Sequence, residues 1–268
     1  MKCNWIVAHE KLESDPAEPK LTDAVKRAGH NLYLSYYKDF MYTKHICPLI
    51  EPTILQGPIN FIKQYKSIGY NPGAYGFTDD MNVSNYISKS NLKGSFLNNG
   101  VFATISQVRN QFKFFIDMNG GEFFIRPNSG FKTFQGFIVS DIKEFELDVR
   151  TQNISNETLC LITTVKEIDF EFRFVICDGE VIAGSQYSWN GKKDVRIDIL
   201  PEAQGLAEMV AKDSWQPDSV YTVDVAILKG RNWIPKIIEF NSFASSGLYQ
   251  CNRDIIVECV SRVAMKEW

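Results

Sequence analysis

The sequence lacks the features that place a protein in a membrane or send it out of the cell. No uninterrupted apolar stretch comes near the length that is needed to cross a bilayer. The first 20 residues hold only one apolar run, Trp5 to Ala8, and a charged stretch follows it, which is not how a secretory leader begins. We therefore expect a soluble, cytoplasmic protein.

Patterns of metal-binding and disulfide-forming residues are also missing. The six cysteines include no C-x-x-C pair, and Cys160, Cys177 and Cys259 sit inside apolar stretches, which predicts reduced, structural thiols. The three histidines all fall in the first fifth of the chain and lack the spacing of zinc ligands. Neither a disulfide framework nor a zinc site is expected.

Charge is nearly balanced, and there is no internal repeat or low-complexity tract. The net charge is −3, without the basic stripe of a dedicated nucleic-acid-binding protein, so nucleic acid is not expected as a direct ligand. With 268 residues, of which 44% are apolar and 23% charged, the chain has the composition of a globular protein with one large domain or two compact lobes. Its oligomeric state is not indicated.

The N-terminal part has the pattern of a mixed αβ region. Residues 21–40 have the pattern of a helical start, with an acid in the first turn and Thr22 and Asp23 as the cap. A second helix is predicted from Ile59 to Tyr65, after short extended pieces that are interrupted by proline. Residues 69–76 are predicted to form a loop.

From about Phe112 onward the pattern changes to strands separated by glycine-containing turns. Two hairpins are predicted, and the expected strands are Phe123 to Arg126, residues 136–140, Phe170 to Ile176, Val181 to Tyr187, Tyr221 to Leu228 and Trp233 to Glu239. Helices are predicted from Leu200 to Ala211 and from Arg253 to Met265. These elements indicate an α+β fold with antiparallel sheets, each of which needs a layer of helices.

A loop between two of these strands carries two cations. Arg126 ends an apolar strand, and Lys132 follows in the polar loop that leads to Gly136. Backbone amides and these two side chains could fold over a polyphosphate, with the arginine as a planar donor and the lysine as a compact charge. The loop lacks the Walker spacing, so a hairpin loop with solvated charges is the favoured interpretation of this segment taken alone.

Two further charged residues share one face of the next strand. Glu171 and Arg173 alternate with three phenylalanines, so both project to the same side. On a solvent-facing side they would be an ordinary polar strand face. On a side that lines a cleft, Arg173 would point at phosphate groups, and alternation alone leaves both interpretations open.

The last hairpin brings two acids and an amide together. Period-two spacing places Glu239 and Asn241 on one face, and hairpin pairing puts Asp224 opposite them. Two carboxylates and an amide oxygen suit Mg²⁺, and buried neighbouring acids are costly unless a cation neutralises them. Because such acids repel each other without metal, Glu239→Gln is expected to leave the metal-free protein as stable or slightly more stable.

In this order along the chain, the three groups of residues resemble the ATP-grasp superfamily. The matching motifs are a cation-bearing strand and phosphate loop, an E-x-R strand that turns through D-G, a D-x-A strand and a terminal E-x-N. The resemblance covers residues 45–255 and is closest to the phage-associated branch in which an arginine replaces the first nucleotide-binding lysine. The Pro52 to Gly57 segment and the run from Glu239 to Tyr249 also fit that branch.

The resemblance implies an ATP-grasp fold, in which two α+β lobes with antiparallel sheets grip ATP, preceded by a smaller αβ region. The expected division is an N-terminal region at 1–115 and a catalytic core at 116–268, with lobes at about 116–165 and 166–268.

The resemblance also assigns roles to residues. Arg126 and Lys132 would bind the ATP phosphates, Arg173 would contact the transferred phosphoryl group or the substrate, and Glu171 would contact the nucleotide. Lys132 and Arg173 would act in catalysis. Magnesium would be held by Asp224, Glu239 and Asn241, and the hinge that grips adenine would be Thr164, Val165, Lys166 and Glu167, although this hinge lacks the family's usual Q-E-x-I pattern.

The implied activity is an ATP-dependent ligase. ATP would phosphorylate a carboxylate, and an amine would then attack the acyl phosphate, releasing ADP and phosphate, with small-molecule or peptide substrates. Two alternatives stay open: a kinase, and a non-catalytic nucleotide-binding protein that takes part in a phage–host interaction. A phage-encoded protein would act in the host cytoplasm.

Overall fold

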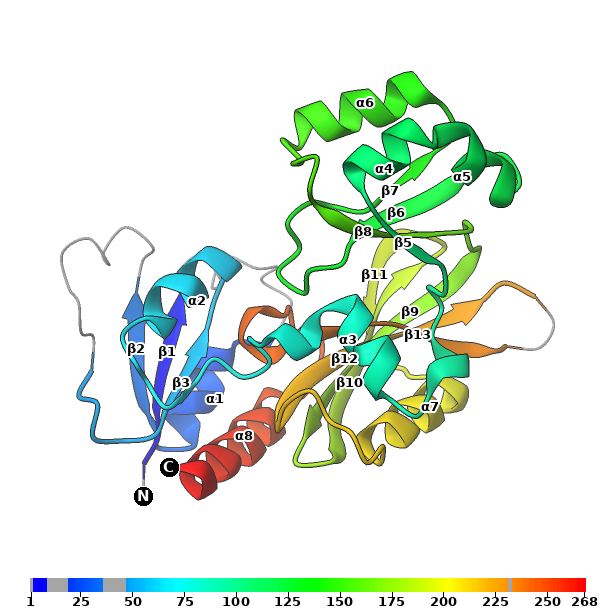
Figure 1. Cartoon of the computed structure of the whole chain (residues 1–268). Helices are drawn as coiled ribbons and strands as arrows, with labels where there is room; N and C mark the ends of the chain where they lie inside the picture. The colour runs from blue at the N-terminus through cyan, green and yellow to red at the C-terminus, as the bar shows by residue number, and fades with distance from the viewer. Residues whose placement is uncertain (1, 9–18, 36–46, 231–232) are drawn as a thin grey trace.

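A computed structural model describes residues 2–8, 19–35, 47–230 and 233–268 (Figure 1). These residues form three four- or five-stranded sheets, each with helices packed against it. No helix in this part of the chain is long and apolar enough to span a bilayer.

The N-terminal sheet is parallel. Its strands, in spatial order, are β2 (Asn31–Ser35), β1 (Asn4–Ala8), β3 (Thr53–Gln56) and β4 (Pro72–Gly73). The helices of this region are α1 (Leu21–Arg27) and α2 (Ile59–Lys66). The prediction of α2 is confirmed, and residues 69–76 form a loop that contributes only the two residues of β4.

The helical start expected within residues 21–40 is α1, which spans Leu21–Arg27. It ends at Arg27 because Gly29 adopts φ +73°, and the amides of Gly29 and His30 bond back to the carbonyls of Lys26 and Val25. A pair of hydrogen bonds of this kind around a glycine in the left-handed conformation is a common way for a helix to end. The chain then enters β2, and residues 36–40 lie outside the described residues. The predicted cap at Thr22 and Asp23 is wrong. The cap position is Lys20, whose side chain forms no hydrogen bond to the first turn.

The second sheet is antiparallel and lies in the green part of the chain in Figure 1. Its strands, in spatial order, are β5 (Val101–Thr104), β8 (Leu159–Thr163), β6 (Phe123–Pro127) and β7 (Phe137–Val139), and its helices are α4 (Ile105–Asn110), α5 (Phe112–Met118) and α6 (Ile142–Thr151). A boundary at residue 115 would cut this unit, because β5 pairs with β8 and Ala103, Ile105 and Val108 pack in one core with Phe123. The unit therefore begins near residue 101.

The third sheet is also antiparallel and is the largest. Its strands, in spatial order, are β11 (Lys192–Arg196), β10 (Glu180–Trp189), β9 (Ile168–Cys177), β12 (Val220–Leu228) and β13 (Pro235–Ser242). Asp178 and Gly179 both have positive φ and join β9 to β10, as the D-G turn predicts. The helix α7 (Pro201–Ala211) packs on the apolar face with Phe172 and Phe174.

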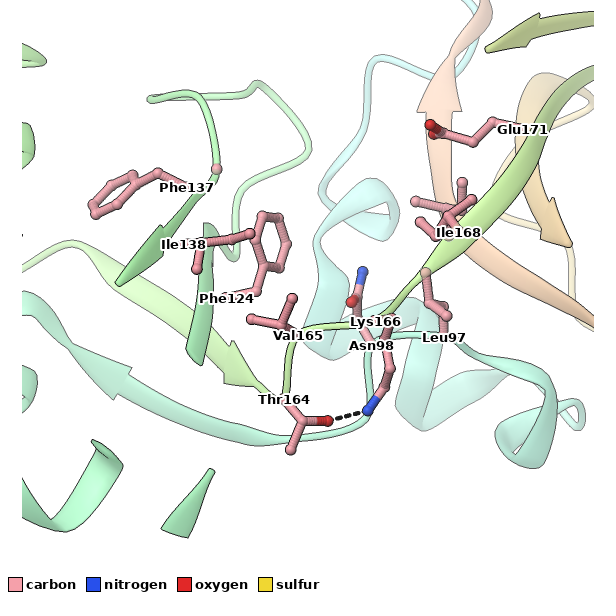
Figure 2. Close-up of a pocket in the computed structure, with 12 residues that line it drawn as sticks. Leu97, Asn98, Phe124, Phe137, Ile138, Thr164, Val165, Lys166, Ile168 and Glu171 are labelled. Atoms are coloured by element: carbon pink, nitrogen blue, oxygen red, sulfur yellow. Dashed lines mark hydrogen bonds between the residues drawn. The ribbon is translucent and has the colours of Figure 1, made fainter. Parts of the chain in front are cut away.

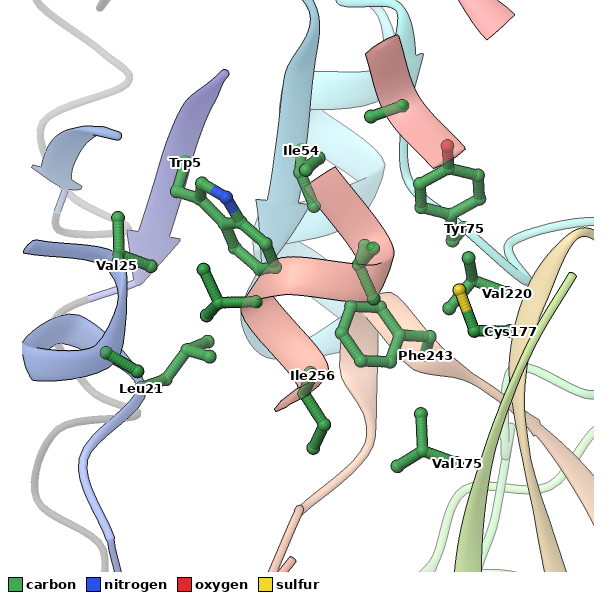
Figure 3. Close-up of a cluster of buried hydrophobic side chains, with 14 of the residues drawn as sticks. Trp5, Leu21, Val25, Ile54, Tyr75, Val175, Cys177, Val220, Phe243 and Ile256 are labelled. Carbon is green, nitrogen blue, oxygen red and sulfur yellow. The ribbon is translucent and has the colours of Figure 1, made fainter. Parts of the chain in front are cut away.

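The C-terminal helix ties the first sheet to the third. Helix α8 (Arg253–Glu267) buries Ile256 and Val257 in a cluster that contains Trp5 from β1 and Val175 from β9 (Figure 3). The indole nitrogen of Trp5 donates to the hydroxyl of Ser261 over 3.0 Å. The two ends of the described chain therefore share one hydrophobic core.

Shorter helices join the first sheet to the second. They are η3 (Asp79–Met81), α3 (Val83–Lys89) and η4 (Lys93–Ser95), and a further turn, η5 (Phe243–Ser245), follows β13. The chain from η4 to β5 runs along the third sheet before it enters the second, since the amide of Leu97 donates to the carbonyl of Ile237 on β13 over 2.8 Å. This path brings both antiparallel sheets to one cleft.

Candidate nucleotide and metal site

A cavity of about 490 Å³ opens between the second and third sheets (Figure 2). Thr164, Val165 and Lys166, which lie between β8 and β9, line it, and Glu171 of β9 lines its far side. The ammonium group of Lys166 donates to the hydroxyl of Thr164 at the cavity edge. Of the four predicted hinge residues, Glu167 is absent from the lining, and its carbonyl accepts a bond from the Lys229 amide over 3.1 Å.

The other walls of the cavity are mostly apolar, and the residues that form them were not predicted as site residues. They come from both antiparallel sheets and from the segment before β5, namely Leu97, Phe124, Phe137, Ile138, Ile168 and Ile238, together with Asn98 and Gly136. Alternation along β6 could have identified one of them. Phe123 and Ile125 point into the core of the second sheet, so Phe124 shares the opposite face with Arg126.

A β-bulge explains why Ile238 was missed. Asp224 pairs with Glu239, whereas Val225 pairs with Ile237, so Ile238 is an extra residue on β13. Ile237 and Phe240 are buried against α7, while the consecutive Ile238 and Glu239 both face the cleft. Strict alternation from Glu239 predicts Ile237 in the cleft instead. Bulges of this kind redirect side chains and are common beside active sites.

Arg126, Lys132 and Glu239 form a charged cluster beside this cavity. The guanidinium of Arg126 donates to Glu239 Oε2 over 2.5 Å and Lys132 Nζ donates to Glu239 Oε1 over 3.0 Å. The side chains of Arg126 and Glu239 are only 10% and 12% exposed, whereas that of Lys132 is 49% exposed. Lys132 also has φ +46°, a conformation that is uncommon for a residue with a side chain.

The loop that carries Lys132 is packed tightly at its base. A Cβ atom at Gly130 would lie 2.5 Å from Met81 Cβ and 2.7 Å from the Met81 carbonyl oxygen. The amide of Gly130 bonds to the side chain of Asn82 over 3.1 Å, and Asn128 bonds to the amide of Ser84. The η3 and α3 segments therefore hold this loop at the cleft.

A second cluster joins Arg173, Asp224 and Asn241. The guanidinium of Arg173 donates to both oxygens of Asp224, at 2.7 Å each, and to the carbonyl of Gly247. Asn241 Nδ2 donates to Asp224 Oδ2 over 3.1 Å. All three residues are buried, and a planar bidentate pair of this kind fixes the guanidinium in position.

Two tyrosines pack around Arg173. The rings of Tyr187 and Tyr249 stack with centroids 5.0 Å apart, and the guanidinium carbon lies 5.6 Å and 5.3 Å from them. Burial and the charges of Asp224 and Glu171 raise the pKa of Tyr187 well above its usual range, so its hydroxyl stays protonated and donates to Glu171 over 2.7 Å. The E-x-R strand is thus held to β10.

The electrostatics of the two clusters differ from what the sequence suggests. Burial on its own would raise the pKa of Glu239, but the charges of Arg126 and Lys132 outweigh it and hold that pKa well below its usual range. Asp224 forms an ion pair with Arg173 over 2.7 Å. Each acid is therefore paired with a cation, so the mutual repulsion on which the expected effect of Glu239→Gln rested is absent, and these ion pairs favour the opposite prediction, a loss of stability in the metal-free protein.

The donor set still has the chemistry that Mg²⁺ requires. Asp224 and Glu239 are directly opposite each other on β12 and β13, and Asn241 reaches Asp224. Carboxylate and amide oxygens are hard donors, and Mg²⁺ usually takes only one or two carboxylates besides waters and phosphates. Across the described residues, no group of three or more His, Cys, Asp or Glu side chains is gathered to hold a metal by itself.

Comparisons with known proteins agree with this arrangement. Residues 101–259 match the family described as "ATP-grasp domain, R2K clade family 2". Curated protein sequences contain no match to this chain.

Solved structures show the same fold at low sequence identity. The D-cycloserine synthetase DcsG superposes with a TM-score of 0.63 at 10% identity, over 98% of this chain and 99% of the other. The D-alanine–D-alanine ligase of Bacillus anthracis gives 0.60 at 15% identity over the whole of both chains. PsnB, an ATP-grasp ligase complexed with a minimal precursor, gives 0.59 at 10% identity, over 98% of this chain and 100% of the other.

These likenesses confirm the predicted α+β fold with antiparallel sheets around a cleft. The family match covers more than half of the 268 residues and includes every residue of the two charged clusters. The chain therefore belongs to the ATP-grasp superfamily, in R2K clade family 2.

Proposed function

We propose that Mg-ATP binds in the cleft between the second and third sheets. The observation that carries this proposal is the continuity of the cavity with the charged clusters. Phe124 of the cavity and Arg126 share one face of β6, and Ile238 of the cavity directly precedes Glu239. An apolar pocket that opens onto cations and acids matches a nucleotide with its base buried and its phosphates at the charged end.

In this arrangement each predicted site residue has a place. Arg126 and Lys132 bind phosphate oxygens, with Arg126 in the position of the first nucleotide-binding lysine. The hinge at Thr164, Val165 and Lys166 borders the base, Glu167 lies outside the cavity lining, and Glu171 lies on the nucleotide side of β9. Asp224, Glu239 and Asn241 would hold Mg²⁺, which when bound neutralises charge on the transferring phosphoryl group.

The reaction we propose is ligation of a carboxylate to an amine through an acyl phosphate. The carboxylate oxygen attacks the γ-phosphorus of ATP and ADP leaves. The amine then attacks the acyl carbon, loses a proton and expels phosphate. Arg173, fixed by Asp224 and the two tyrosines, orients the phosphorylated substrate, and the closed lobes keep water from the intermediate. The mechanism needs no nucleophilic serine or cysteine.

The family match and the fold support an ATP-dependent ligase more strongly than the two alternatives. A kinase would use the same cradle with a stable acceptor. A non-catalytic phage–host factor would need neither the neighbouring acids Asp224 and Glu239 nor the buried Arg173 that Asp224 holds. Similar structures include a D-alanine–D-alanine ligase and an ATP-grasp ligase complexed with a precursor peptide, so amino acids and peptides are the first substrates to examine.

The test is a screen for ADP release with Mg-ATP over paired carboxylates and amines, with mass spectrometry of the products. Hydroxylamine, which traps acyl phosphates as hydroxamates, should replace the amine. Formation of a stable phosphorylated product without an amine would favour the kinase. The whole proposal fails if millimolar Mg-ATP neither binds nor raises the melting temperature.

A further inference from the structure

One polar side chain lies within the apolar part of the cavity. Asn98 is only 6% exposed, and Figure 2 shows its amide among the lining residues, with Val165 and Leu97 nearby. This amide forms no hydrogen bond to any other described residue. The amide is not among the polar atoms that are shut off from solvent without a partner, so its donor and acceptor open onto the cavity. The partner that the cavity offers is a ligand.

The backbone holds Asn98 in this position from both sides. The amide of Leu97 bonds to Ile237 on the third sheet, and the carbonyl of Asn99 accepts from the Thr163 hydroxyl on the second sheet over 3.3 Å. Gly100 lies so close to β8 that any Cβ there would overlap the carbonyl oxygen of Ile162. With its neighbours fastened to both sheets, Asn98 is fixed on the segment that crosses the cleft.

The chemistry of the amide indicates what it would bind. Its oxygen accepts one hydrogen bond and its NH₂ group donates, on adjacent atoms. Adenine offers the matching pair, a 6-amino donor beside a ring-nitrogen acceptor, and asparagine pairs with adenine in this bidentate way. Most of the remaining lining is apolar and suits a flat ring, and Thr164, Lys166 and Glu171 are its polar members.

We propose that Asn98 is a specificity-determining residue that recognises the 6-amino group and the adjacent ring nitrogen of adenine. This inference rests on the proposed function, since it takes the cavity as the nucleotide site. Asn98 lies outside the matched family region, which begins at residue 101. A site built to bond the amino group disfavours a nucleotide without it, because the buried amide then loses a partner.

The experiment compares the affinities of ATP and purine riboside triphosphate, which lacks the 6-amino group, by calorimetry with Mg²⁺ present. In Asn98→Leu, a change of similar volume, the preference for ATP over the analogue should fall about fivefold, close to one net hydrogen bond. Asn99→Leu is the matched control, because Asn99 is the adjacent asparagine but is exposed, and its preference should equal that of the wild type.

The outcomes separate this inference from the proposed function. An unchanged preference in Asn98→Leu, with both nucleotides still bound, overturns the role of Asn98 and leaves the nucleotide site standing. If the wild type binds neither nucleotide, both proposals are overturned. Should Asn98→Leu fail to fold, Asn98→Ser provides the same comparison, since its shorter side chain cannot span both groups of the base.

Discussion

Glu239 has two roles that compete for the same carboxylate. Its carboxylate is a proposed magnesium ligand, yet the metal-free structure uses it to neutralise the buried Arg126. Removing one partner of a buried pair leaves the other charge without compensation. The residue therefore contributes to stability before any ligand arrives.

We predict that Glu239→Gln lowers the unfolding free energy of the metal-free protein by roughly 3 kcal/mol, because the Arg126 charge is stranded. Urea unfolding followed by circular dichroism measures this. Lys132→Met is the control, since Lys132 is half exposed and its charge is hydrated without Glu239. Equal stability of Glu239→Gln and the wild type would show that the Arg126–Glu239 pair does not stabilise the fold.

The same carboxylate predicts a dependence of stability on pH. Folding lowers the pKa of Glu239, so its contribution is fully present above the pKa of an unfolded glutamate, about 4.3, and is lost as pH falls toward its folded pKa. Between about pH 5 and 3 the wild type should therefore lose more stability than Glu239→Gln. Parallel losses in the two proteins, measured by thermal unfolding in the same buffers, would contradict this.

At the scale of elements, the phosphate loop depends on a close approach to η3. We predict that Gly130→Ala displaces the loop, because its Cβ would meet both the side chain and the carbonyl of Met81. ATP affinity should fall at least tenfold through misplacement of Lys132, with a lower melting temperature as well. Gly94→Ala is the control, since a Cβ at Gly94 meets no atom within 4 Å. Full ATP affinity in Gly130→Ala would show that the loop tolerates the shift.

Some helices and strands could be predicted from the sequence, and others were missed. Strands with strict alternation and a D-G turn, such as β9 and β10, were predictable because their pattern is local. Helix α4 was missed although Thr104 and Gln107 form a complete capping box, a signal that is present in the sequence. The end of α1 at Gly29 was also recoverable from its glycine.

Other features of the site depend on tertiary structure alone. The bulge at Ile238 interrupts the alternation of β13 just before Glu239, and no residue type at that position indicates it. Asn98 and Asn99 are the same type of residue, and only the attachment of their segment to two sheets buries the first and exposes the second. The sequence likewise does not show which cation from another strand pairs with each acid, which is why the two acids were expected to repel each other.

At the scale of the whole molecule, the charged clusters couple the binding of metal and nucleotide. Phosphates that take Arg126 and Lys132 leave Glu239 without its cations, and a metal that takes Glu239 leaves the cations without their acid. Binding both together restores neutrality on each side. The two ligands should therefore raise each other's affinity, and the effect must be reciprocal.

We predict that ATP binds at least tenfold more tightly with excess Mg²⁺ than with EDTA, and that this ratio shrinks in Glu239→Gln. Isothermal titration calorimetry under both conditions measures the ratio without any need for turnover. Lys132→Met should lower the affinity for ATP in both conditions, and Mg²⁺ should still raise that affinity. Identical affinities with Mg²⁺ and EDTA in the wild type would refute the coupling.

The packing of Trp5 against α8 has a consequence for how the protein is made. Strand β1 is synthesised before both antiparallel sheets, and the helix α8 that covers Trp5 is synthesised after them. During translation the N-terminal sheet therefore exposes an apolar face while the segments of the two antiparallel sheets are made. This face is covered only once α8 has been synthesised, so nascent chains that lack α8 should be prone to aggregation and should bind chaperones that recognise apolar segments.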